Sequence, residues 1–170
     1  LSGDQDLLQL VGDNICILQP QNGGKTKCLR RDEVMEKLGV SPERVADYKA
    51  LAGDSSDKLA GVPGIRPKGA VQIISQWGDI ETAIAHVDEI TGKPGELLRE
   101  YASNARETKQ MALLHRDLQI DGYSEEAGQV PDAMPTALPE FLKQMNSQRL
   151  LTWAKRLFPE GVAPEQMGMF

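Results

Sequence analysis

The sequence predicts a helix-rich α/β fold, in which a small sheet accompanies a series of short helices. Apolar residues recur at a spacing of three to four over 70–77 and over 80–87, which is typical of amphipathic helices. Residues that start and stop helices bracket these stretches. Only "NICILQP" clearly combines alternation with β-branched residues, as a strand does. The pattern leaves two architectures open: an α/β fold with few of its strands, or a mostly helical fold with a small sheet.

The composition is that of a globular domain. The chain has 170 residues, of which 40% are hydrophobic and only 5% aromatic, so its core is expected to be aliphatic. No apolar run is long enough to cross a bilayer, and no signal peptide is apparent. The net charge of −6 argues against non-specific binding of nucleic acid by the whole surface, but this sum hides local basic patches. Cys16 and Cys28 lack metal-ligand spacing, and free thiols in a reducing cytosol are expected rather than a disulfide.

The first third of the chain carries clear punctuation for short elements. Pro20 and the following "QNGGK" mark a turn that suits a hairpin. Gly39 ends one helix, and Ser41 as N-cap with Pro42 at the first helical position starts another, which Gly53 ends. The expected elements are a helix over 6–11, a strand over 14–18, a helix over 30–38 and a helix over 42–52.

The remainder of the chain is predicted to be mostly helical. Residues 55–77 are expected to form a helix, the tight turn "GVPGI" and a second helix that Pro67 opens. Asp79 is the expected N-cap of the next helix. The other expected elements are a long helix over 96–115, a short strand at "DLQID", a loop at "EEAGQVPDAMPTALP", helices over 139–145 and 147–157, and a frayed tail.

Two pairs of aspartates have spacings that suit a shared cation. Asp4 and Asp6 lie two apart, so an extended backbone points them to one side. Asp54 and Asp57 lie three apart, so a helical turn makes them neighbours. Carboxylates are preferred ligands of hard divalent cations such as Mg²⁺ and Mn²⁺. The alternative is structural, because Asp is also a common residue of helix caps and turns.

A glycine-rich basic segment follows the second pair. Gly61 and Gly64 permit positive φ and a close approach of another backbone. The expected helix behind them has a free N-terminus, which binds phosphate readily, and Arg66 and Lys68 lie on it. No acid occurs between Lys58 and residue 77. The segment therefore suits a helix-hairpin-helix that grips a DNA backbone, and the structural alternative is an ordinary αα-hairpin.

Three stretches in this order resemble the 5′-nuclease family: "SGDQDLLQLV", "ADYKALAGDSSD" and "GVPGIRPKGA". The family includes the 5′-3′ exonuclease domain of bacterial DNA polymerase I, free-standing 5′-3′ exonucleases and flap endonucleases. The resemblance runs from Leu1 to about Phe158 and implies the C-terminal portion of a 5′-nuclease, PIN-like fold with a helix-hairpin-helix subdomain. It implies four parts, namely nuclease core over 1–52, metal-ligand loop and helix-hairpin-helix over 53–95, C-terminal helices over 96–158, and a tail over 159–170.

The resemblance also implies site residues. The family's acids carry over to Asp4, Asp6, Asp54 and Asp57 as catalytic ligands of two divalent cations, Mg²⁺ or Mn²⁺. The family's remaining acids have no counterpart here, so a further N-terminal half is expected to complete the site. The family's hairpin binds duplex DNA, often with a monovalent cation such as K⁺. The DNA-binding residues that this implies are Gly61, Val62, Gly64, Ile65, Arg66 and Lys68.

The implied function is divalent-metal-dependent hydrolysis of phosphodiester bonds at DNA 5′ ends, flaps and nicked duplexes, in DNA replication and repair. The expected partners are DNA and either the missing N-terminal half or a DNA polymerase domain. The expected location is cytoplasmic, or organellar in a eukaryote. A different class of function stays open, that of a non-catalytic helix-hairpin-helix module that binds DNA. A purely structural αα-domain is a third hypothesis.

The chain departs from the family pattern at Lys58, Ala60, Arg66 and Gly69, where most members have Asn, Pro, Gly, and Thr or Ser. Lys58 is expected to pair with Asp57 and weaken its affinity for metal, and Arg66 adds a cation at the hairpin.

Four further residues are not assigned to the site. His86 and His115 lack metal-ligand partners in the sequence and are expected in core or surface roles. Trp77 and Trp153 lie on apolar helical stripes and are expected to pack in the core.

Overall fold

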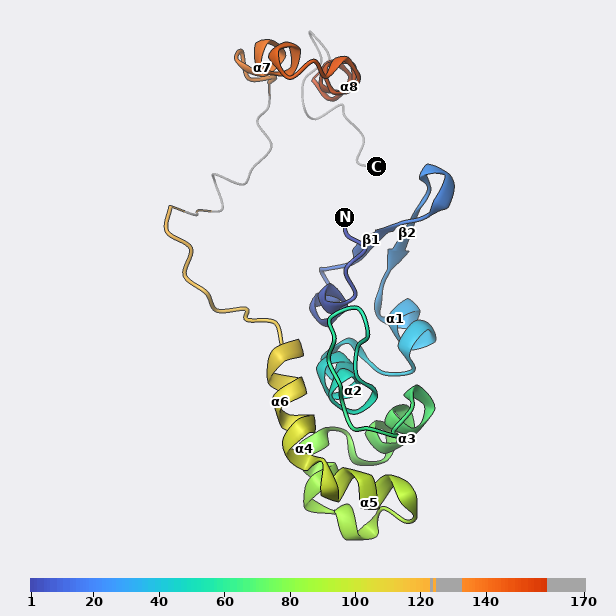
Figure 1. The fold of residues 1–170 in the computed structure, drawn as a ribbon. Coiled ribbons are helices and arrows are strands. Elements are labelled where there is room, and N and C mark those ends of the chain that lie inside the picture. Colours follow the sequence, from blue (N-terminus) through green and yellow to red (C-terminus); the bar gives the residue numbers. More distant parts are fainter. Residues whose placement is uncertain (123, 125–132, 159–170) are drawn as a thin grey trace. The chain divides into compact units, whose positions relative to one another are not determined.

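A computed structural model describes residues 1–122, 124 and 133–158. The chain divides into two compact units, Leu1–Asp117 and Leu118–Phe170, and each is a separate body. Figure 1 shows that the first unit is built mainly from short helices, with one two-stranded sheet. This confirms the predicted helix-rich fold with a small sheet. None of the helices in the described ranges is long and apolar enough to cross a membrane.

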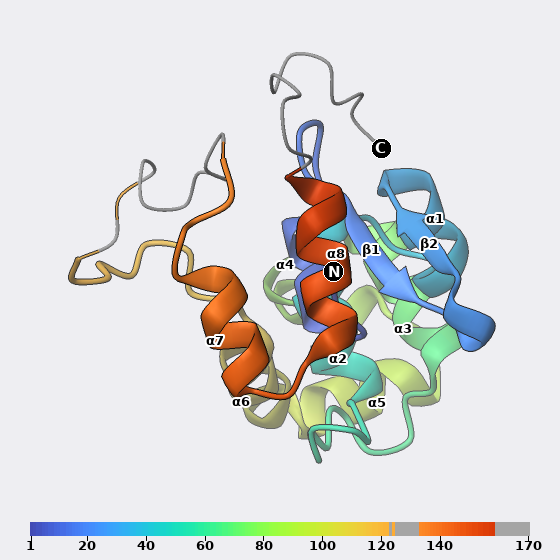
Figure 2. The same cartoon turned by 90° about the horizontal axis from the view of Figure 1, so that it is seen from above.

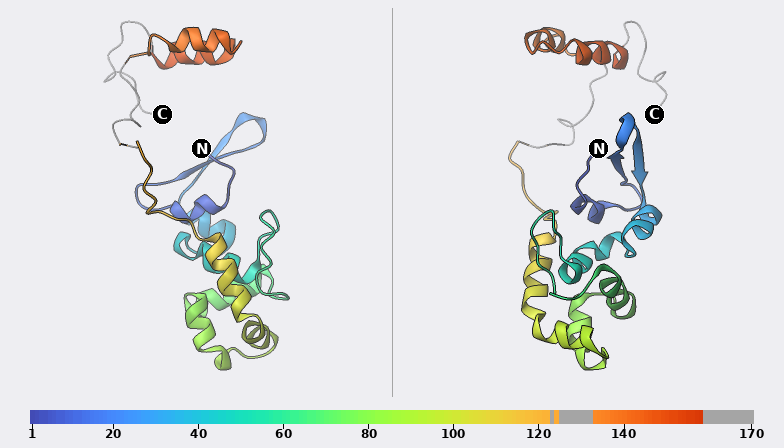
Figure 3. Two further views of the ribbon diagram at one scale, coloured as in Figure 1. Left: turned by 60° about the vertical axis from the view of Figure 1, so that its left-hand side comes forward. Right: turned by 45° about the vertical axis from the view of Figure 1, so that its right-hand side comes forward.

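The N-terminal part of the first unit is a hairpin beside a short helix. A 3₁₀ helix covers Asp6–Leu10, and strands β1 (Ile17–Pro20) and β2 (Thr26–Leu29) pair antiparallel, with Leu18 opposite Cys28. The hairpin is confirmed, but its first strand begins three residues later than predicted and includes Pro20. A proline is tolerated there because each strand of a two-stranded sheet is an edge strand. Figure 3 shows the hairpin projecting from the helices of this unit.

Two helices follow the hairpin much as their caps predict. Helix α1 (Arg31–Leu38) ends at Gly39, which adopts the left-handed conformation with φ of 76°. A 3₁₀ turn over Pro42–Arg44 then leads into α2 (Val45–Ala52). One hydrophobic cluster joins the hairpin to these helices, and it consists of Leu8, Val11, Ile17, Leu29, Val34 and Val45.

Helix α2 is the central element of the first unit. It packs between α3 (Pro67–Trp77) and α6 (Ala102–Ala112), as Figure 1 shows. Helices α4 (Ile80–Ala85) and α5 (Lys93–Glu100), with a 3₁₀ turn over Val87–Glu89 between them, complete the unit. The main core is aliphatic, as predicted, and its buried members include Val40, Ala50, Leu51, Val62, Ile65, Ala70, Ile73, Ile74, Ile80 and Leu98.

The prediction of a first helix within residues 55–77 is wrong. Residues 53–66 form a loop, in which Asp54 and Leu59 exchange both backbone hydrogen bonds, at 2.9 and 2.8 Å. The Asp54 side chain accepts a hydrogen bond from the Ser56 N–H at 2.9 Å, which closes a tight turn instead of starting a helix. The second helix, α3, begins at Pro67 as predicted. Helix α2 is therefore the helix that precedes the basic loop.

The prediction of one long helix over 96–115 is also wrong, because two helices occupy this region. Helix α5 begins earlier, with Pro94 in its first turn, and the backbone leaves helical geometry at Tyr101, with φ of −108° and ψ of 25°. The break lets Leu98 on α5 and Ala105 on α6 both pack into the main core. The strand predicted at "DLQID" is not formed, since the sheet in the described residues contains β1 and β2 alone.

The second unit contains a helical hairpin of α7 (Leu138–Gln144) and α8 (Gln148–Leu157), which Figure 2 shows side by side. Its small core joins Leu142, Leu151 and Ala154. Trp153 is 53% exposed, so its predicted core role is wrong. The predicted tail and most of the predicted proline-rich loop lie outside the described residues.

Two residues left outside the predicted site lie together in the first unit. The half-buried Trp77 packs against the main core, as predicted, and its ring stacks on His86 with ring centroids 5.0 Å apart. His86 also contacts the Thr82 carbonyl oxygen through Nδ1 at 2.9 Å. This confirms the packing role of Trp77, and it places the exposed His86 at the surface, one of the two roles expected for it.

Candidate functional site

The N-terminal segment is fixed against the helices by a buried glutamine. Gln9 is 5% exposed, and its Nε2 donates a hydrogen bond to the Ala112 carbonyl at the end of α6, at 2.8 Å. Leu8 and Val11 on either side of it are buried in the hairpin cluster. These contacts hold Asp6, at the start of the same 3₁₀ helix, next to α2.

Lys49 on α2 is the centre of the candidate site. Its side chain is only 6% exposed, and its Nζ lies 2.6 Å from Asp54 Oδ2 and 3.6 Å from Asp57 Oδ2. The same ammonium is hydrogen-bonded to Asp6 Oδ1. Three of the four aspartates predicted as metal ligands therefore surround one buried ammonium, although Asp6 comes from a distant part of the sequence.

Asp4, the fourth predicted ligand, does not share this ammonium. It is exposed, and its Oδ1 accepts a hydrogen bond from the Asp6 N–H at 2.9 Å, while its own N–H donates to Ser2 Oγ at 3.0 Å. Asp4 thus has the turn-forming role that was the structural alternative for these acids. Its hydrogen bond fixes the backbone from which the Asp6 side chain reaches Lys49.

The charges in this cluster support one another. Burial alone would lower the pKa of Lys49, but its hydrogen bonds to Asp54 and Asp6 outweigh this effect and raise the pKa. Burial would raise the pKa of Asp54, but hydrogen bonds from Lys49 and Ser56 lower it to about 2. Burial and the Asp54 charge both raise the pKa of Tyr48. At neutral pH, the site therefore holds a charged Lys49 ammonium beside the ionised Asp54 carboxylate.

The donor chemistry of the cluster suits a hard cation, since carboxylate oxygens are the ligands that such ions prefer. Its geometry, however, is closed. No group of three or more acidic, histidine or cysteine side chains in the described ranges is arranged to hold a metal ion. The point at which Asp6, Asp54 and Asp57 converge is filled by the Lys49 ammonium. The three aspartates are ligands of the right chemical kind for a divalent cation, but they could bind one only if the Lys49 ammonium moved away.

The basic residue predicted to affect Asp57 was the wrong one. Lys58 is exposed, adopts a positive φ of 57° and makes no ion pair with any described residue. Asp57 pairs with Lys49 instead. Sequence reasoning missed Lys49 because a lysine on a helix is usually exposed. The signal in the sequence was that Lys49 lies among the apolar residues of "VADYKALA", several of which are buried.

A small cavity opens beside the cluster. It has a volume of about 180 Å³, and Lys49, Asp54 and Tyr48 are among the residues that line it. The other lining residues are Gln5, Leu38, Gly53 and Ser55.

The predicted DNA-binding residues divide into buried and exposed groups. Val62 and Ile65 are 2% and 6% exposed and belong to the main core, so only their backbone atoms can face a ligand. Gly61 is also buried, with φ of 61°, and a Cβ atom there would lie 2.3 Å from the Gly53 backbone nitrogen. This close approach, which only glycine permits, anchors the loop to the end of α2.

The exposed group gathers at the start of α3. Gly64, with φ of 92°, precedes Arg66 at the N-cap and Lys68 in the first turn, and all three are exposed. The first turn of α3 contains no acid, and neither cation pairs with an acid in the described part of the chain. The free N–H groups of a helix start and two unpaired cations favour a phosphate.

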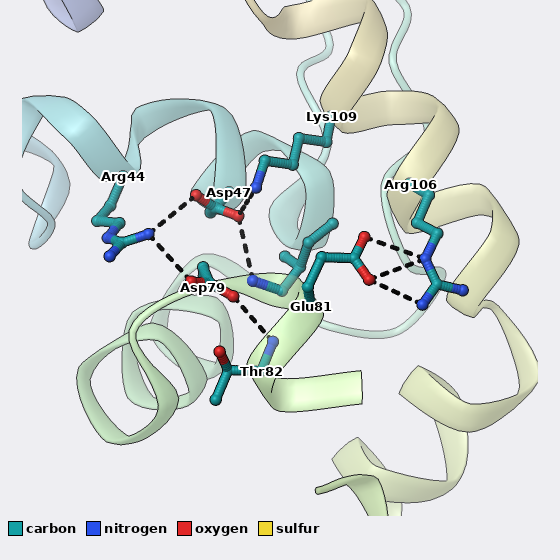
Figure 4. A network of polar contacts seen from close by, with 8 residues as sticks. Arg44, Asp47, Asp79, Glu81, Thr82, Arg106 and Lys109 are labelled. Atoms are coloured by element: carbon teal, nitrogen blue, oxygen red, sulfur yellow. Dashed lines mark hydrogen bonds and ion pairs between the residues drawn. The ribbon is translucent and has the colours of Figure 1, made fainter. Parts of the chain in front are cut away.

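A second charge network anchors the other side of α2 (Figure 4). Asp47 is 2% exposed, and its Oδ1 lies 2.6 Å from Lys109 Nζ on α6. The same Oδ1 accepts a hydrogen bond from the Ile80 N–H at 3.1 Å. Arg44 lies 3.8 Å from Asp47 and 3.3 Å from Asp79. The network joins α2, α4 and α6 and thereby fixes the helix that carries Lys49.

Comparison with known proteins places this arrangement in context. The family model described as "5'-3' exonuclease, C-terminal SAM fold" matches residues 40–134. DNA polymerase I of Mycobacterium bovis is 33% identical over 135 residues, which are 79% of this chain and 14% of that protein. DNA polymerase I of Bacillus caldotenax is 37% identical over 123 residues, 71% of this chain and 14% of that protein.

A shorter relative covers more of the chain. The 5′-3′ exonuclease of Aquifex aeolicus is 29% identical over 157 residues, which are 92% of this chain and 52% of that protein. The chain thus spans about half of this relative and 14% of the two polymerases.

Proposed function

Because the chain belongs to the 5′-3′ exonuclease family and spans its C-terminal SAM-fold region, we propose that it forms the DNA-holding side of a 5′-3′ exonuclease or flap endonuclease. The proposed reaction is hydrolysis of phosphodiester bonds at DNA 5′ ends, flaps and nicks. One observation carries the proposal. Acids from two distant segments meet around Lys49, and a single loop connects this cluster to the exposed cations of α3.

We propose a divalent cation, Mg²⁺ or Mn²⁺, at the carboxylate cluster. Asp6, Asp54 and Asp57 would hold it, and Asp4 would join them if its turn opened. When bound, such a cation neutralises charge on a phosphate and activates water. The chain's own contribution is to fix these oxygens at the end of the loop, while a further N-terminal segment would supply the remaining acids.

The loop over 61–65 and the start of α3 would hold the DNA backbone. Arg66 and Lys68 would pair with phosphates, and the exposed Gly64 would let the backbone approach closely. If K⁺ binds here, backbone carbonyl groups of this loop would be its ligands. Such contacts read no bases, so binding would depend on structure and salt rather than on sequence.

The test uses a labelled 5′-flap duplex and the complete protein. Asp54→Asn and Asp57→Asn should abolish cleavage in Mg²⁺ and leave duplex binding within about twofold, because neither residue belongs to the proposed DNA grip. Full cleavage by both variants would exclude these residues as ligands. A matched control is Asp88→Asn, which changes an exposed acid on the 3₁₀ turn before α5 and should leave cleavage unchanged.

One observation favours the second candidate, a non-catalytic DNA-binding module, namely the Lys49 ammonium at the point where the acids converge. Titration of the 170-residue chain with duplex DNA in EDTA and in Mg²⁺ separates the two functions. Metal-independent binding without hydrolysis, by both this chain and the complete protein, supports the module. Hydrolysis by the complete protein supports the nuclease. Undetectable binding at low salt would favour a purely structural domain.

A further inference from the structure

We propose that Lys49 is an internal counter-cation of the carboxylate cluster. It holds Asp6, Asp54 and Asp57 together when no metal is bound, and it has to leave their oxygens when a divalent cation enters. Lys49 therefore sets how tightly the protein binds the cation. The inference rests on the proposed function, since it concerns the same metal site.

Lys49 has three acidic partners, one for each N–H donor of its ammonium. A lysine ammonium has three N–H donors and no acceptor. Lys49 directs its ammonium to three carboxylates, with one hydrogen bond to Asp6, one contact of 2.6 Å to Asp54 and a longer ion pair of 3.6 Å to Asp57. The described part of the chain offers these acids no other basic partner. Without Lys49, three negative charges would converge with no compensating charge, which is unfavourable.

A divalent cation would compete with the Lys49 ammonium for the same carboxylate oxygens. A hard divalent cation requires direct bonds of about 2.0–2.6 Å to carboxylate oxygens. Asp54 Oδ2 and Asp6 Oδ1 now accept hydrogen bonds from the ammonium, so a cation that took these oxygens would lie within contact distance of Nζ. Two positive centres at that separation repel strongly in a partly buried site. The cation and the ammonium therefore exclude each other.

A cavity next to the carboxylates gives the ammonium room to leave them. The cavity of about 180 Å³ beside the cluster is lined by Lys49 itself, Tyr48 and Asp54. A lysine side chain has four flexible carbons, so its ammonium can turn into this space without movement of α2. The Asp47 network on the opposite side of the helix keeps its backbone in place.

The experiment compares the wild-type 170-residue chain with Lys49→Met and with the matched control Lys58→Met. Both changes remove one positive charge near Asp57, but Lys58 is exposed and contacts none of the three acids among the described residues. Two quantities are measured: the thermal unfolding midpoint in EDTA, and the Mn²⁺ dissociation constant by titration calorimetry.

Lys49→Met should lower the unfolding midpoint in EDTA by several degrees and tighten Mn²⁺ binding by about tenfold or more, because the competing charge is gone. Lys58→Met should leave the midpoint unchanged and tighten Mn²⁺ binding by no more than about twofold. Lys49→Gln, which keeps hydrogen-bond donors but not the charge, should tighten Mn²⁺ binding like Lys49→Met, and it replaces that variant if Lys49→Met does not fold.

Three outcomes would overturn the proposal, in whole or in part, and they are distinguishable. If the wild type binds Mn²⁺ and Lys49→Gln binds it equally or more weakly, Lys49 is no competitor and the metal site survives without it. If neither the wild type nor any variant binds Mn²⁺, the proposed metal site fails and this inference fails with it. An unchanged midpoint of Lys49→Met in EDTA would overturn the holding role alone.

Discussion

Lys49 Nζ lies 2.6 Å from Asp54 Oδ2, so the last full turn of α2 is tied directly to the loop that follows it. Both side chains are largely buried, at 6% and 15% exposed. Asp57 is 49% exposed and 3.6 Å from the same ammonium, so water screens its ion pair. The two acids of "GDSSD" therefore contribute unequally to stability, although the sequence presents them as a pair.

This difference predicts unequal effects of two substitutions in EDTA. Asp54→Asn should lower the free energy of unfolding by about 2 kcal/mol, because it breaks a largely buried pair while Lys49 keeps Asp6. Asp57→Asn should cost less than about 1 kcal/mol. Urea denaturation followed by circular dichroism measures both values. Equal effects of the two changes would show that the 2.6 Å contact adds nothing to stability.

The buried Asp47 predicts a larger loss. Asp47→Asn should lower the free energy of unfolding by about 3 kcal/mol, because the Lys109 ammonium and the Arg44 guanidinium lose their shared buried partner. The control is Glu81→Gln, in the separate ion pair that joins α4 and α6 beside this network (Figure 4). Glu81 pairs with Arg106 at 2.8 Å, but both side chains are about half exposed, so the change should cost less than about 1 kcal/mol. A cost for Asp47→Asn no larger than the control would contradict the anchoring role of this network.

The close approach of two loop backbones predicts the effect of adding a methyl group. Gly61→Ala should lower the free energy of unfolding by about 2 kcal/mol or more, because a Cβ would lie 2.3 Å from the Gly53 nitrogen and φ is positive. Gly69→Ala in α3 is the matched control, since its new Cβ would lie 3.6 Å from the nearest side-chain atom, on Ile65. That change should be stabilising by up to about 1 kcal/mol. Thermal melts of both variants test this contrast.

The N-cap of α4 predicts a pH dependence. The Thr82 N–H donates to Asp79 Oδ1 at 2.8 Å, and this bond, with the nearby Arg44 charge, lowers the pKa of Asp79 although burial opposes it. A lowered pKa means that the stabilisation is complete above the ordinary Asp pKa of about 3.9 and is lost as the pH falls below it. Asp79→Ala should therefore cost about 1 kcal/mol at pH 7 and less at pH 3. A cost that does not change between these pH values would exclude the charged cap.

The exposed cations of α3 predict how DNA binding depends on salt. The double variant Arg66→Ala/Lys68→Ala should weaken duplex binding and reduce the slope of log affinity against log salt by about 2, since two phosphate contacts are lost. Lys93→Ala, which removes a cation at the start of α5, is the control and should leave the slope unchanged. Fluorescence anisotropy over a salt series measures both. An unchanged slope for the double variant would place the DNA elsewhere on the surface.

The sequence by itself determined the local features of this protein. Gly39, Pro67 and Asp79 fix helix ends through their own backbone and capping chemistry, so their roles could be predicted without a fold. The acids and the basic loop were recognisable as motifs for the same reason, because their spacing carries the signal.

Only the tertiary structure decided the features that depend on distant partners. The helix predicted from residue 55 gave way to a loop because Asp54 pairs with Leu59, and the long helix broke at Tyr101 because both halves reach one core. From the sequence alone, Lys49 would be interpreted as an ordinary exposed lysine on a helix. Its role among three acids depends on Asp6, which lies 43 residues away in the chain. Burial and long-range charge pairing arise from packing, which no local pattern records.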